Sequence, residues 1–464
     1  MKKLVALILS IVLLTTLLIT PGFSYDDTTH QNAAQHLFDR GLLKGVERED
    51  GTVDLALDEI LTREQAVVLL VRLLGKEAEA YACDFPCSFT DVPQWAVPYI
   101  GYAQVTGLTL GMGDGTFGVG QPVTGVQFMT FVLRALGYCT PIDFVWTDAC
   151  AMAESIGLPG NDFRGITALT RGDAVVMCDW ALTRDTKSGK QLLEFIADAG
   201  KVSSTPKLTE VSSYSAKGGS TKTTGSVKIN DEDKIGATHK KLIDQYSSIY
   251  VKGDGNVQVL IVSTHATEAY TPNDGLEYKE QGGEYRTLND QRNMLRVGEV
   301  ITNILNSRGI GTIHLNVVED YPKYTDAYKR MRVHIEEILE QYPGIQLVID
   351  VHRDSFPYKN LNAKTLATVN GKETAQLEFV VGTGTNTHWK ENAGTQVRLH
   401  NMLENRYPGL MRPMMVRDSN YNHDLTAGSM LIEVGSSGNT LSEAMYSAYL
   451  FGTTLADYLL GATE

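Results

Sequence analysis

The sequence predicts two structural units, an all-α half followed by an α/β domain whose sheet is flanked by helices. Up to about residue 195, a helix, a glycine-rich turn and a second helix occur three times, which indicates an internal repeat. From about residue 239, short apolar strands alternate with amphipathic helices, as in α/β sheets covered by helices. With 464 residues, 43% of them apolar, the chain is long enough for two or three domains.

Residues 1–24 have the pattern of a secretory signal peptide. Two lysines precede an apolar stretch at residues 4–19, and the small residues Gly22 and Ser24 suit cleavage before Tyr25. An uncleaved membrane anchor is the alternative, because the apolar stretch is near the shortest length that spans a bilayer. In either case we expect the rest of the chain to lie outside the cytoplasm.

The charge and the cysteine content of the chain limit the possible partners and catalytic residues. The net charge of -14 argues against nucleic acid as a partner, because phosphate binding needs clustered Lys and Arg. All five cysteines precede the middle of the chain, so we expect no cysteine nucleophile in the second half. An exported chain permits disulfides. The spacing allows Cys83 to pair with Cys87 and Cys139 with Cys150, which leaves Cys178 over.

The three repeats span about residues 26–80, 85–140 and 141–195. In each repeat the second helix begins after a Thr or a similar N-cap residue. Residues 201–238 are then rich in Ser, Thr, Gly and Lys and have no apolar period. This composition predicts a flexible linker, and about 35 such residues span on the order of 30 Å. The α/β domain covers residues 239–464.

Motifs in the second repeat are specific, with FTDV at residues 89–92, Trp95, and GDGTF at residues 113–117. Through them the three units resemble S-layer homology repeats. The resemblance implies a pseudo-threefold helical bundle that binds an anionic, pyruvylated secondary polymer of the bacterial cell wall.

Two arginines match the polymer-binding Arg of that family, Arg63 in the first repeat and Arg171 in the third. The second repeat has Gly125 at this position. An Arg at a helix start can hold a carboxylate through two parallel hydrogen bonds, assisted by the helix dipole. The alternative for each is a solvated Arg without a ligand.

In the α/β domain, two apolar strands lead into histidines. Residues 257–262 predict a buried strand, and His265 and Glu268 follow its carboxyl end, where open α/β sheets place their chemistry. Residues 345–351 predict another strand, which leads directly into His352. These three side chains are therefore candidates for a shared site.

A third strand, residues 430–434, contains Glu433 within an otherwise apolar run. An ionised carboxylate is costly there unless it is paired, bound to a metal or at an open end. His265, Glu268 and His352 supply three ligands of a catalytic zinc ion and leave a fourth position for water. Glu433 is then predicted to be the general base.

Alternatives exist for the third ligand, because Glu284 and Asp290 lie in the loop after the first strand. Asp350 shares a strand face with His352. It is predicted to orient that histidine or a neighbouring ligand, with a backbone cap as the alternative.

Substrate contacts are predicted more loosely. Arg353 is expected either to bind a substrate carboxylate or to pair with Asp354. Asn386, Asn422 and Asn439 lie in loops after strands and are candidates for contacts with glycan or peptide, with turn formation as the alternative.

The remaining elements of the α/β domain follow from hydrophobic periodicity. The predicted helices cover residues 293–307, 325–341, 392–406 and 442–460, and further strands cover residues 312–318 and 376–381.

Three motifs of the second half are distinctive, THATEAY at residues 264–270, DVHRDS at 350–355 and LIEVGSSGNTLSEA at 431–444. Through them residues 257–461 resemble stage II sporulation protein P, which is related to the zinc-dependent N-acetylmuramoyl-L-alanine amidases. The resemblance implies a zinc hydrolase that cleaves peptidoglycan at the amide between N-acetylmuramic acid and L-Ala, with a second, endopeptidase activity possible in some members. It also implies a role in sporulation.

The combined expectation is a secreted amidase retained on the bacterial cell wall, with Zn²⁺ as cofactor and peptidoglycan as substrate. Two alternatives remain. One is a catalytically inactive protein that only binds peptidoglycan, and the other is a zinc peptidase acting on a peptide substrate.

Overall fold

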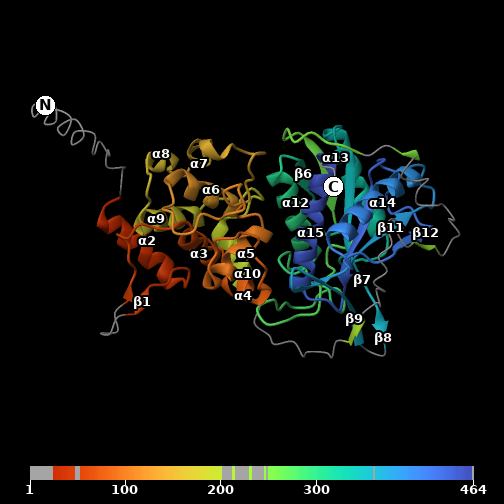
Figure 1. Cartoon of the computed structure of the whole chain (residues 1–464), viewed down its shortest axis with the longest axis horizontal. Coiled ribbons are helices and arrows are strands. Elements are labelled where there is room, and N and C mark those ends of the chain that lie inside the picture. The colour runs from red at the N-terminus through yellow and green to blue at the C-terminus, as the bar shows by residue number, and fades with distance from the viewer. Residues whose placement is uncertain are drawn as a thin grey trace, which may run out of the picture.

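The computed structural model describes residues 25–47, 53–200, 212–214, 229–231, 245–246, 249–358 and 361–461. The predicted signal peptide lies outside the described residues. Among the described helices, none has both the length and the apolar character needed to span a bilayer. The chain forms a helical N-terminal half and an α/β C-terminal half that lie side by side (Figure 1).

The N-terminal half consists of helices and two short strands, β1 (Val46–Glu47) and β2 (Val53–Asp54). Its cysteines are free thiols, so neither of the two allowed pairs forms. Its helices are α2 (Asp27–Asp39), α3 (Arg63–Leu73), α4 (Glu77–Cys83), α5 (Val97–Val105), α6 (Gly125–Ala135), α7 (Ala149–Ser155), α8 (Gly160–Phe163), α9 (Arg171–Leu182) and α10 (Leu192–Gly200), with 3-10 turns at Gln94–Ala96 and Trp146–Asp148.

A closed ring of backbone hydrogen bonds joins the three repeats. Leu61, Val123 and Leu169 each lie two residues before α3, α6 and α9, respectively. The N–H of Leu61 donates to Leu169, that of Leu169 to Val123, and that of Val123 back to Leu61, at 2.8, 2.9 and 3.0 Å. All three side chains are buried. The repeats therefore meet around a common centre through equivalent positions.

The C-terminal half contains a seven-stranded mixed sheet in the order β4-β12-β11-β13-β7-β5-β6. Strands β6, β5, β7 and β13 are parallel to one another, while β11 is antiparallel to β13 and parallel to β12, which in turn is parallel to β4. The strands are β4 (Ile229–Asp231), β5 (Val257–Val262), β6 (Gly311–His314), β7 (Leu347–Asp354), β11 (Leu377–Gly382), β12 (Met414–Arg417) and β13 (Met430–Ser436).

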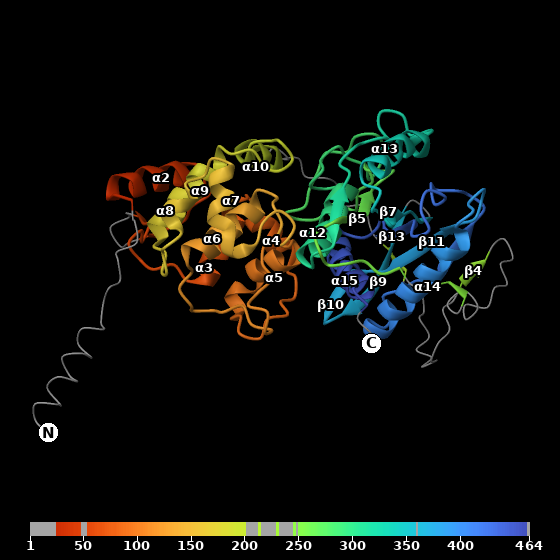
Figure 2. The same ribbon diagram turned by 90° about the horizontal axis from the view of Figure 1, so that it is seen from above.

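Helices cover both faces of this sheet (Figure 2). Alternate residues of β5 face opposite layers, because Val259 and Ile261 pack into the large core and Leu260 and Val262 into a smaller one under α13. Burial on both faces explains the continuous apolar run of this strand. The helices are α12 (Met294–Ser307), α13 (Ala327–Gln341), α14 (Trp389–Arg406) and α15 (Leu441–Leu459).

A smaller sheet lies beside the main one and was not predicted. Its hairpin joins β9 (Leu361–Val369) to β10 (Lys372–Ala375), with β3 (Ser212–Tyr214) and β8 (Pro357–Tyr358) also paired to β9. Strands β3 and β4 lie within residues 201–238, so the predicted linker contains two segments that pair with the C-terminal half. The rest of that linker lies outside the described residues.

The β9–β10 turn generates a stability prediction. Asn370 and Gly371 form a two-residue turn with φ of 53° and 78°, the conformation that favours Asn-Gly. A Cβ on Gly371 would meet no atom within 4 Å. Gly371→Ala is therefore expected to lower the free energy of unfolding by about 1 kcal/mol through backbone strain alone, measured by denaturant titration. Gly371→Asn should recover part of this loss, and equal stability of the two variants would contradict the explanation.

Candidate metal centre

The candidate site lies where neighbouring parallel strands end. Strands β5, β7 and β13 are adjacent and parallel, so their carboxyl ends meet at one edge of the sheet. A cavity of about 410 Å³ opens there. Its lining contains His265, Glu268, Glu284, Arg286, Tyr324, Tyr328, His352, Arg353, Asp354, Ser355, Glu378, Val380, Met415, Arg417, Tyr421, Leu431 and Glu433.

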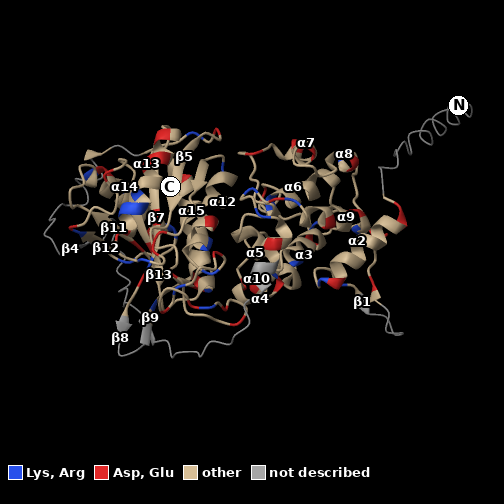
Figure 3. Cartoon of the chain, turned by 180° about the vertical axis from the view of Figure 1, so that it is seen from behind, with Lys and Arg blue, Asp and Glu red and all other residues tan. Residues whose placement is uncertain are grey.

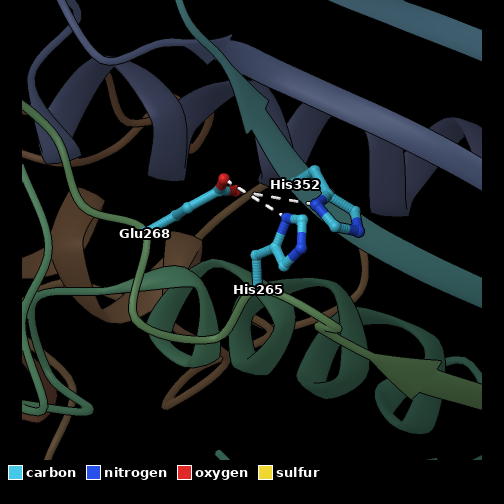
Figure 4. A group of neighbouring side chains, drawn as sticks. All are labelled: His265, Glu268 and His352. Atoms are coloured by element: carbon cyan, nitrogen blue, oxygen red, sulfur yellow. Dashed lines mark ion pairs between the residues drawn. The ribbon is translucent and has the colours of Figure 1, made fainter. Parts of the chain in front are cut away.

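A tight turn after β5 brings His265 and Glu268 together. The backbone N–H of Glu268 donates to the carbonyl of His265 at 3.0 Å. This turn leaves Glu268 Oε1 3.6 Å from His265 Nδ1. The other oxygen, Oε2, lies 3.6 Å from Nδ1 of His352 on β7. One carboxylate therefore faces two imidazoles from different strands (Figure 4).

These three residues have the composition and spacing of a metal site. Their potential ligand atoms all lie within 4.8 Å of one another, and no other group of His, Cys, Asp or Glu among the described residues meets this criterion. Two imidazole nitrogens and one carboxylate oxygen are ligands that suit zinc. The observed arrangement therefore fits the predicted ligand set.

The ionised form of Glu268 is stabilised from several sides. Burial alone would raise the pKa of this carboxyl, but His265, His352 and Arg353 together lower it well below its ordinary value. Arg286 Nη2 donates to Oε1 at 3.2 Å, and the backbone N–H of Arg353 donates to Oε2 at 3.3 Å. Glu268 is therefore a carboxylate at neutral pH.

Asp350 holds the far side of His352. Its Oδ1 lies 2.9 Å from His352 Nε2, while Nδ1 of the ring faces Glu268. Asp350 is itself fixed by the backbone N–H and the hydroxyl of Thr264, at 2.8 and 2.6 Å. Burial lowers the pKa of His352, but Asp350 and Glu268 raise it well above its ordinary value. Asp350 is thus an ionic partner beside the ring nitrogen that faces away from Glu268, without a hydrogen bond to Nε2.

Glu433 lines the same cavity, but its surroundings shift its pKa in the opposite direction to that of Glu268. It is paired in register with His352 across β7 and β13, so both side chains project from the same face of the sheet. Its Oε2 has no hydrogen-bond partner. Burial raises the pKa of Glu433 to about 8, with the nearby acids Asp354 and Glu378 adding to the rise. This carboxyl is free to exchange a proton near neutral pH.

A buried ion cluster that was not predicted from the sequence lies beside Glu433. Glu378 on β11 is in register with Glu433. Its Oε2 lies 2.8 Å from Arg412 Nη2, and Arg412 Nη1 lies 2.9 Å from Asp354 Oδ2. Burial raises the pKa of Glu378 to about 7, although Arg412 opposes the rise. The signal was present, because Glu378 interrupts an apolar strand as Glu433 does.

Three tyrosines of the cavity were also missed. The Tyr324 ring stacks on His265 at 4.4 Å between centroids, and its hydroxyl lies 3.3 Å from His265 Nδ1. Tyr328 stacks on His352 at 6.1 Å and contacts Tyr421 at 5.5 Å. No sequence pattern marks these residues, since Tyr324 in a loop and Tyr328 on α13 approach the histidines only in the folded chain.

The structure does not bring all predicted substrate residues to the cavity. Arg353 lines it, but its guanidinium donates to the backbone carbonyls of Ala269 and Tyr285. Asn386, Asn422 and Asn439 are absent from the cavity lining.

The amide groups of these asparagines stabilise loops instead. Asn386 donates to Gly382 O at 2.8 Å, Asn422 to Tyr328 O at 3.0 Å, and Asn439 to Thr365 O at 2.9 Å. Of these contacts, only that of Asn386 is local and fits turn formation, whereas those of Asn422 and Asn439 join segments that lie far apart in the sequence.

The two alternative ligands also differ in position. Glu284 lines the cavity but does not belong to the group of three ligand atoms, and Asp290 does not line the cavity. Among the described residues, Glu268 is therefore the acid placed to act with the two histidines.

Arg63 and Arg171 occupy matching positions at the starts of α3 and α9. Arg63 is buried, and its Nε donates to Phe117 O at 2.9 Å. Arg171 Nε donates to Leu55 O at 2.9 Å and its Nη2 to Lys44 O at 2.8 Å. Both side chains therefore fasten a neighbouring loop to the bundle, which leaves fewer donors for a polymer than expected.

Comparison with known proteins identifies relatives that match parts of the chain. A 31% identity over 207 residues links the chain to stage II sporulation protein P of Bacillus subtilis (strain 168), covering 42% of this chain and 49% of that protein. The cell surface protein of Thermoanaerobacter kivui is 33% identical over 162 residues, covering 34% and 20%. The middle cell wall protein of Brevibacillus brevis is 29% identical over 168 residues, covering 34% and 15%. The matches span about half or less of these curated relatives.

Among solved structures, the N-acetylmuramoyl-L-alanine amidase AmiC2 of Nostoc punctiforme matches 45% of this chain and 97% of its own, with 12% identity and a TM-score of 0.27. At so low a TM-score this likeness transfers nothing to the chain.

The family model described as stage II sporulation protein P matches residues 184–456, which is more than half of the chain and contains every residue of the candidate centre. The chain therefore belongs to the stage II sporulation protein P family.

Proposed function

We propose that this protein is a zinc-dependent peptidoglycan hydrolase of the cell surface, and that it cleaves the amide between N-acetylmuramic acid and L-Ala. The observation that carries the proposal is the convergence of His265, Glu268 and His352 at the cavity that also contains Glu433. His265, Glu268 and His352 would hold the ion. When bound, zinc polarises a carbonyl, lowers the pKa of a bound water and leaves one position open.

The chain supplies the proton transfers of the reaction. Hydrolysis adds the oxygen of water to the amide carbon and breaks the carbon–nitrogen bond. Glu433 takes a proton from the attacking water and delivers it to the departing amine nitrogen. Its unpartnered Oε2 and its pKa of about 8 suit both steps.

Other side chains fix the geometry of these groups. Asp350 orients His352 through its 2.9 Å contact with Nε2. Arg286 and the N–H of Arg353 orient the two oxygens of Glu268. A ligand held rigidly in this way loses little entropy on binding the ion.

The substrate assignment rests on family membership and on the surface relatives. Cell surface and cell wall proteins match this chain in part, which favours a location at the cell surface and a wall substrate. We propose that the N-terminal half consists of S-layer homology repeats that bind the pyruvylated wall polymer, with Arg63 and Arg171 near the binding surface. A role in sporulation is proposed from the family alone.

One experiment separates this function from its alternatives. Purified peptidoglycan is digested with the full chain, with and without a chelator, and the new chemical ends are identified. New L-Ala amines with intact glycan support the amidase, and cuts only inside peptides support a zinc peptidase. Wall binding without any cleavage would contradict the proposed hydrolase.

The first prediction from the proposed function concerns Glu433. Glu433→Gln keeps the size of the side chain but removes its proton transfer, so kcat is expected to fall by about 10²- to 10⁴-fold. Zinc content, measured by atomic absorption, should stay at the level of the unmodified protein. Glu373→Gln is the matched control, because Glu373 is exposed on β10 and lies outside the cavity. Full activity in the Glu433 variant would contradict its assigned role.

The second prediction concerns the ligands. His352→Ala removes one imidazole from the group of three, so zinc should be lost during dialysis, together with activity. Asp350→Asn keeps all three ligands and should weaken zinc affinity by about 10- to 100-fold. Both affinities are measured by competition with a chromogenic chelator. Unchanged zinc binding in His352→Ala would rule out this site.

A further inference from the structure

The N-terminal half contacts the loop that carries part of the candidate centre. This loop, residues 271–292, connects the turn after β5 to helix α12. We infer that helix α4 of the N-terminal half is a positioning element of the catalytic site, because it holds this loop against the cavity. The inference extends the proposed function by assigning the N-terminal half a second role besides wall binding.

A buried acid on α4 forms the central contact. Glu79 is 2% exposed, and its Oε2 lies 2.7 Å from Arg292 Nη1 at the end of the loop. Its Oε1 accepts from the Tyr102 hydroxyl at 2.8 Å and lies 3.4 Å from Arg296 Nη2 on α12. Lys76 on the N-terminal side completes the cluster, with Nζ 3.0 Å from Glu79 Oε2.

Lys76 also reaches across to the loop itself. Its Nζ donates to Gln291 Oε1 at 3.0 Å, and Lys76 is 4% exposed. Burial by itself would raise the pKa of Glu79, and the three cations around it lower it below its ordinary value. A buried charge that loses its partners is strongly destabilising. If the two halves moved apart, these charged groups would lose their partners. The contact therefore opposes movement of one half relative to the other.

The beginning of the loop rests on the same helix. Gly275 has φ of 81°, and a Cβ placed on it would lie 3.0 Å from Ala82 Cβ and 3.1 Å from Ala78 O. Arg292 Nη2 also reaches Gly275 O at 3.4 Å. Helix α4 thus contacts the loop near both of its ends.

The middle of the loop reaches the ligand. The carbonyl of Tyr285 accepts from Ala269 N at 2.9 Å and from Arg353 Nη2 at 3.0 Å. Arg286 Nη2 then donates to Glu268 Oε1, and its Nη1 donates to Asp320 Oδ2 at 2.7 Å. Helix α4, the loop and the ligand carboxylate are therefore connected by direct contacts.

Further contacts hold the two halves in one orientation. Asn303 on α12 donates to Thr106 O at 3.0 Å, and a Cβ on Gly107 would lie 2.9 Å from Asn303 Cβ. The rings of Phe85 and Tyr446 stack at 6.0 Å between centroids. Acidic and basic positions are otherwise interspersed over both halves (Figure 3), so the buried cluster is a local feature and does not reflect oppositely charged faces.

Hydrogen exchange of the full chain tests the inference without any need for activity. Glu79→Gln removes the charge that holds Arg292, so amides in residues 271–292 are expected to exchange about tenfold faster, measured by mass spectrometry of peptides. Glu77→Gln is the matched control. Glu77 lies on the same helix, but its partners Lys44, Arg72 and Tyr99 belong to the N-terminal half, so the loop should exchange at its original rate.

A second variant keeps the test valid if Glu79→Gln disturbs the folding of the N-terminal half. Ala82→Leu enlarges a partly buried side chain that faces Gly275 and leaves the ion cluster intact. It should also accelerate exchange in residues 271–292. Unchanged exchange of the loop in both variants would overturn the inference.

Zinc affinity distinguishes positioning of the site from a purely structural role of Glu79, because a purely structural role would leave the affinity unchanged. If the loop positions Glu268 through Arg286, Glu79→Gln should weaken zinc binding by about tenfold, while Glu77→Gln should not. Faster loop exchange with unaltered zinc affinity would refute the positioning role. If the unmodified protein binds no zinc, the proposed function fails, and the exchange result still decides whether α4 holds the loop.

Discussion

The C-terminal half depends on keeping one buried carboxylate, Glu268, ionised. Burial opposes its charge, and the fold compensates with two imidazoles, a guanidinium and a backbone N–H. These partners come from the turn after β5, from β7 and from the loop that ends at α12. Any arrangement of strands that separated them would leave an unpaired charge in the interior, which is costly. The candidate centre and the order of the central strands are therefore specified together.

The sequence predicted the elements of this half well and their long-range pairing poorly. The strand at residues 257–262 was predicted with its observed bounds, and the bounds of the four helices that follow it differ by at most a few residues. Apolar periodicity is a local signal, so it finds elements. It does not give strand direction, and it missed β12 and the hairpin around Gly371. Glu378 and Arg412 were missed for the same reason, since their proximity to Glu433 arises only when β11 pairs with β13.

In the N-terminal half, the repeats were predictable because each one has its own turn and N-cap residues. The contacts between the repeats were not predictable. The ring through Leu61, Val123 and Leu169 is made by backbone atoms, which every residue has. Arg63 and Arg171 illustrate a related limit. Their positions were predicted from the family pattern, but Nε of each guanidinium donates to a backbone carbonyl, and Nη2 of Arg171 donates to a second one. A matching residue type does not reveal how many of its donors remain for a ligand.

Glu268 and Glu433 show how one cavity can give two acids different chemistry. Both lie near His352, and burial opposes the charge of both. Glu268 has ionic and N–H partners at its two oxygens, so its pKa falls well below the ordinary value. For Glu433 burial outweighs the charge of His352, nearby acids add to the effect, and the pKa rises to about 8, while one oxygen has no hydrogen-bond partner. A group that holds its charge suits a ligand, and one that titrates near neutrality suits proton transfer. The proposed division of roles between these two residues thus rests on their neighbours, since their side chains are identical.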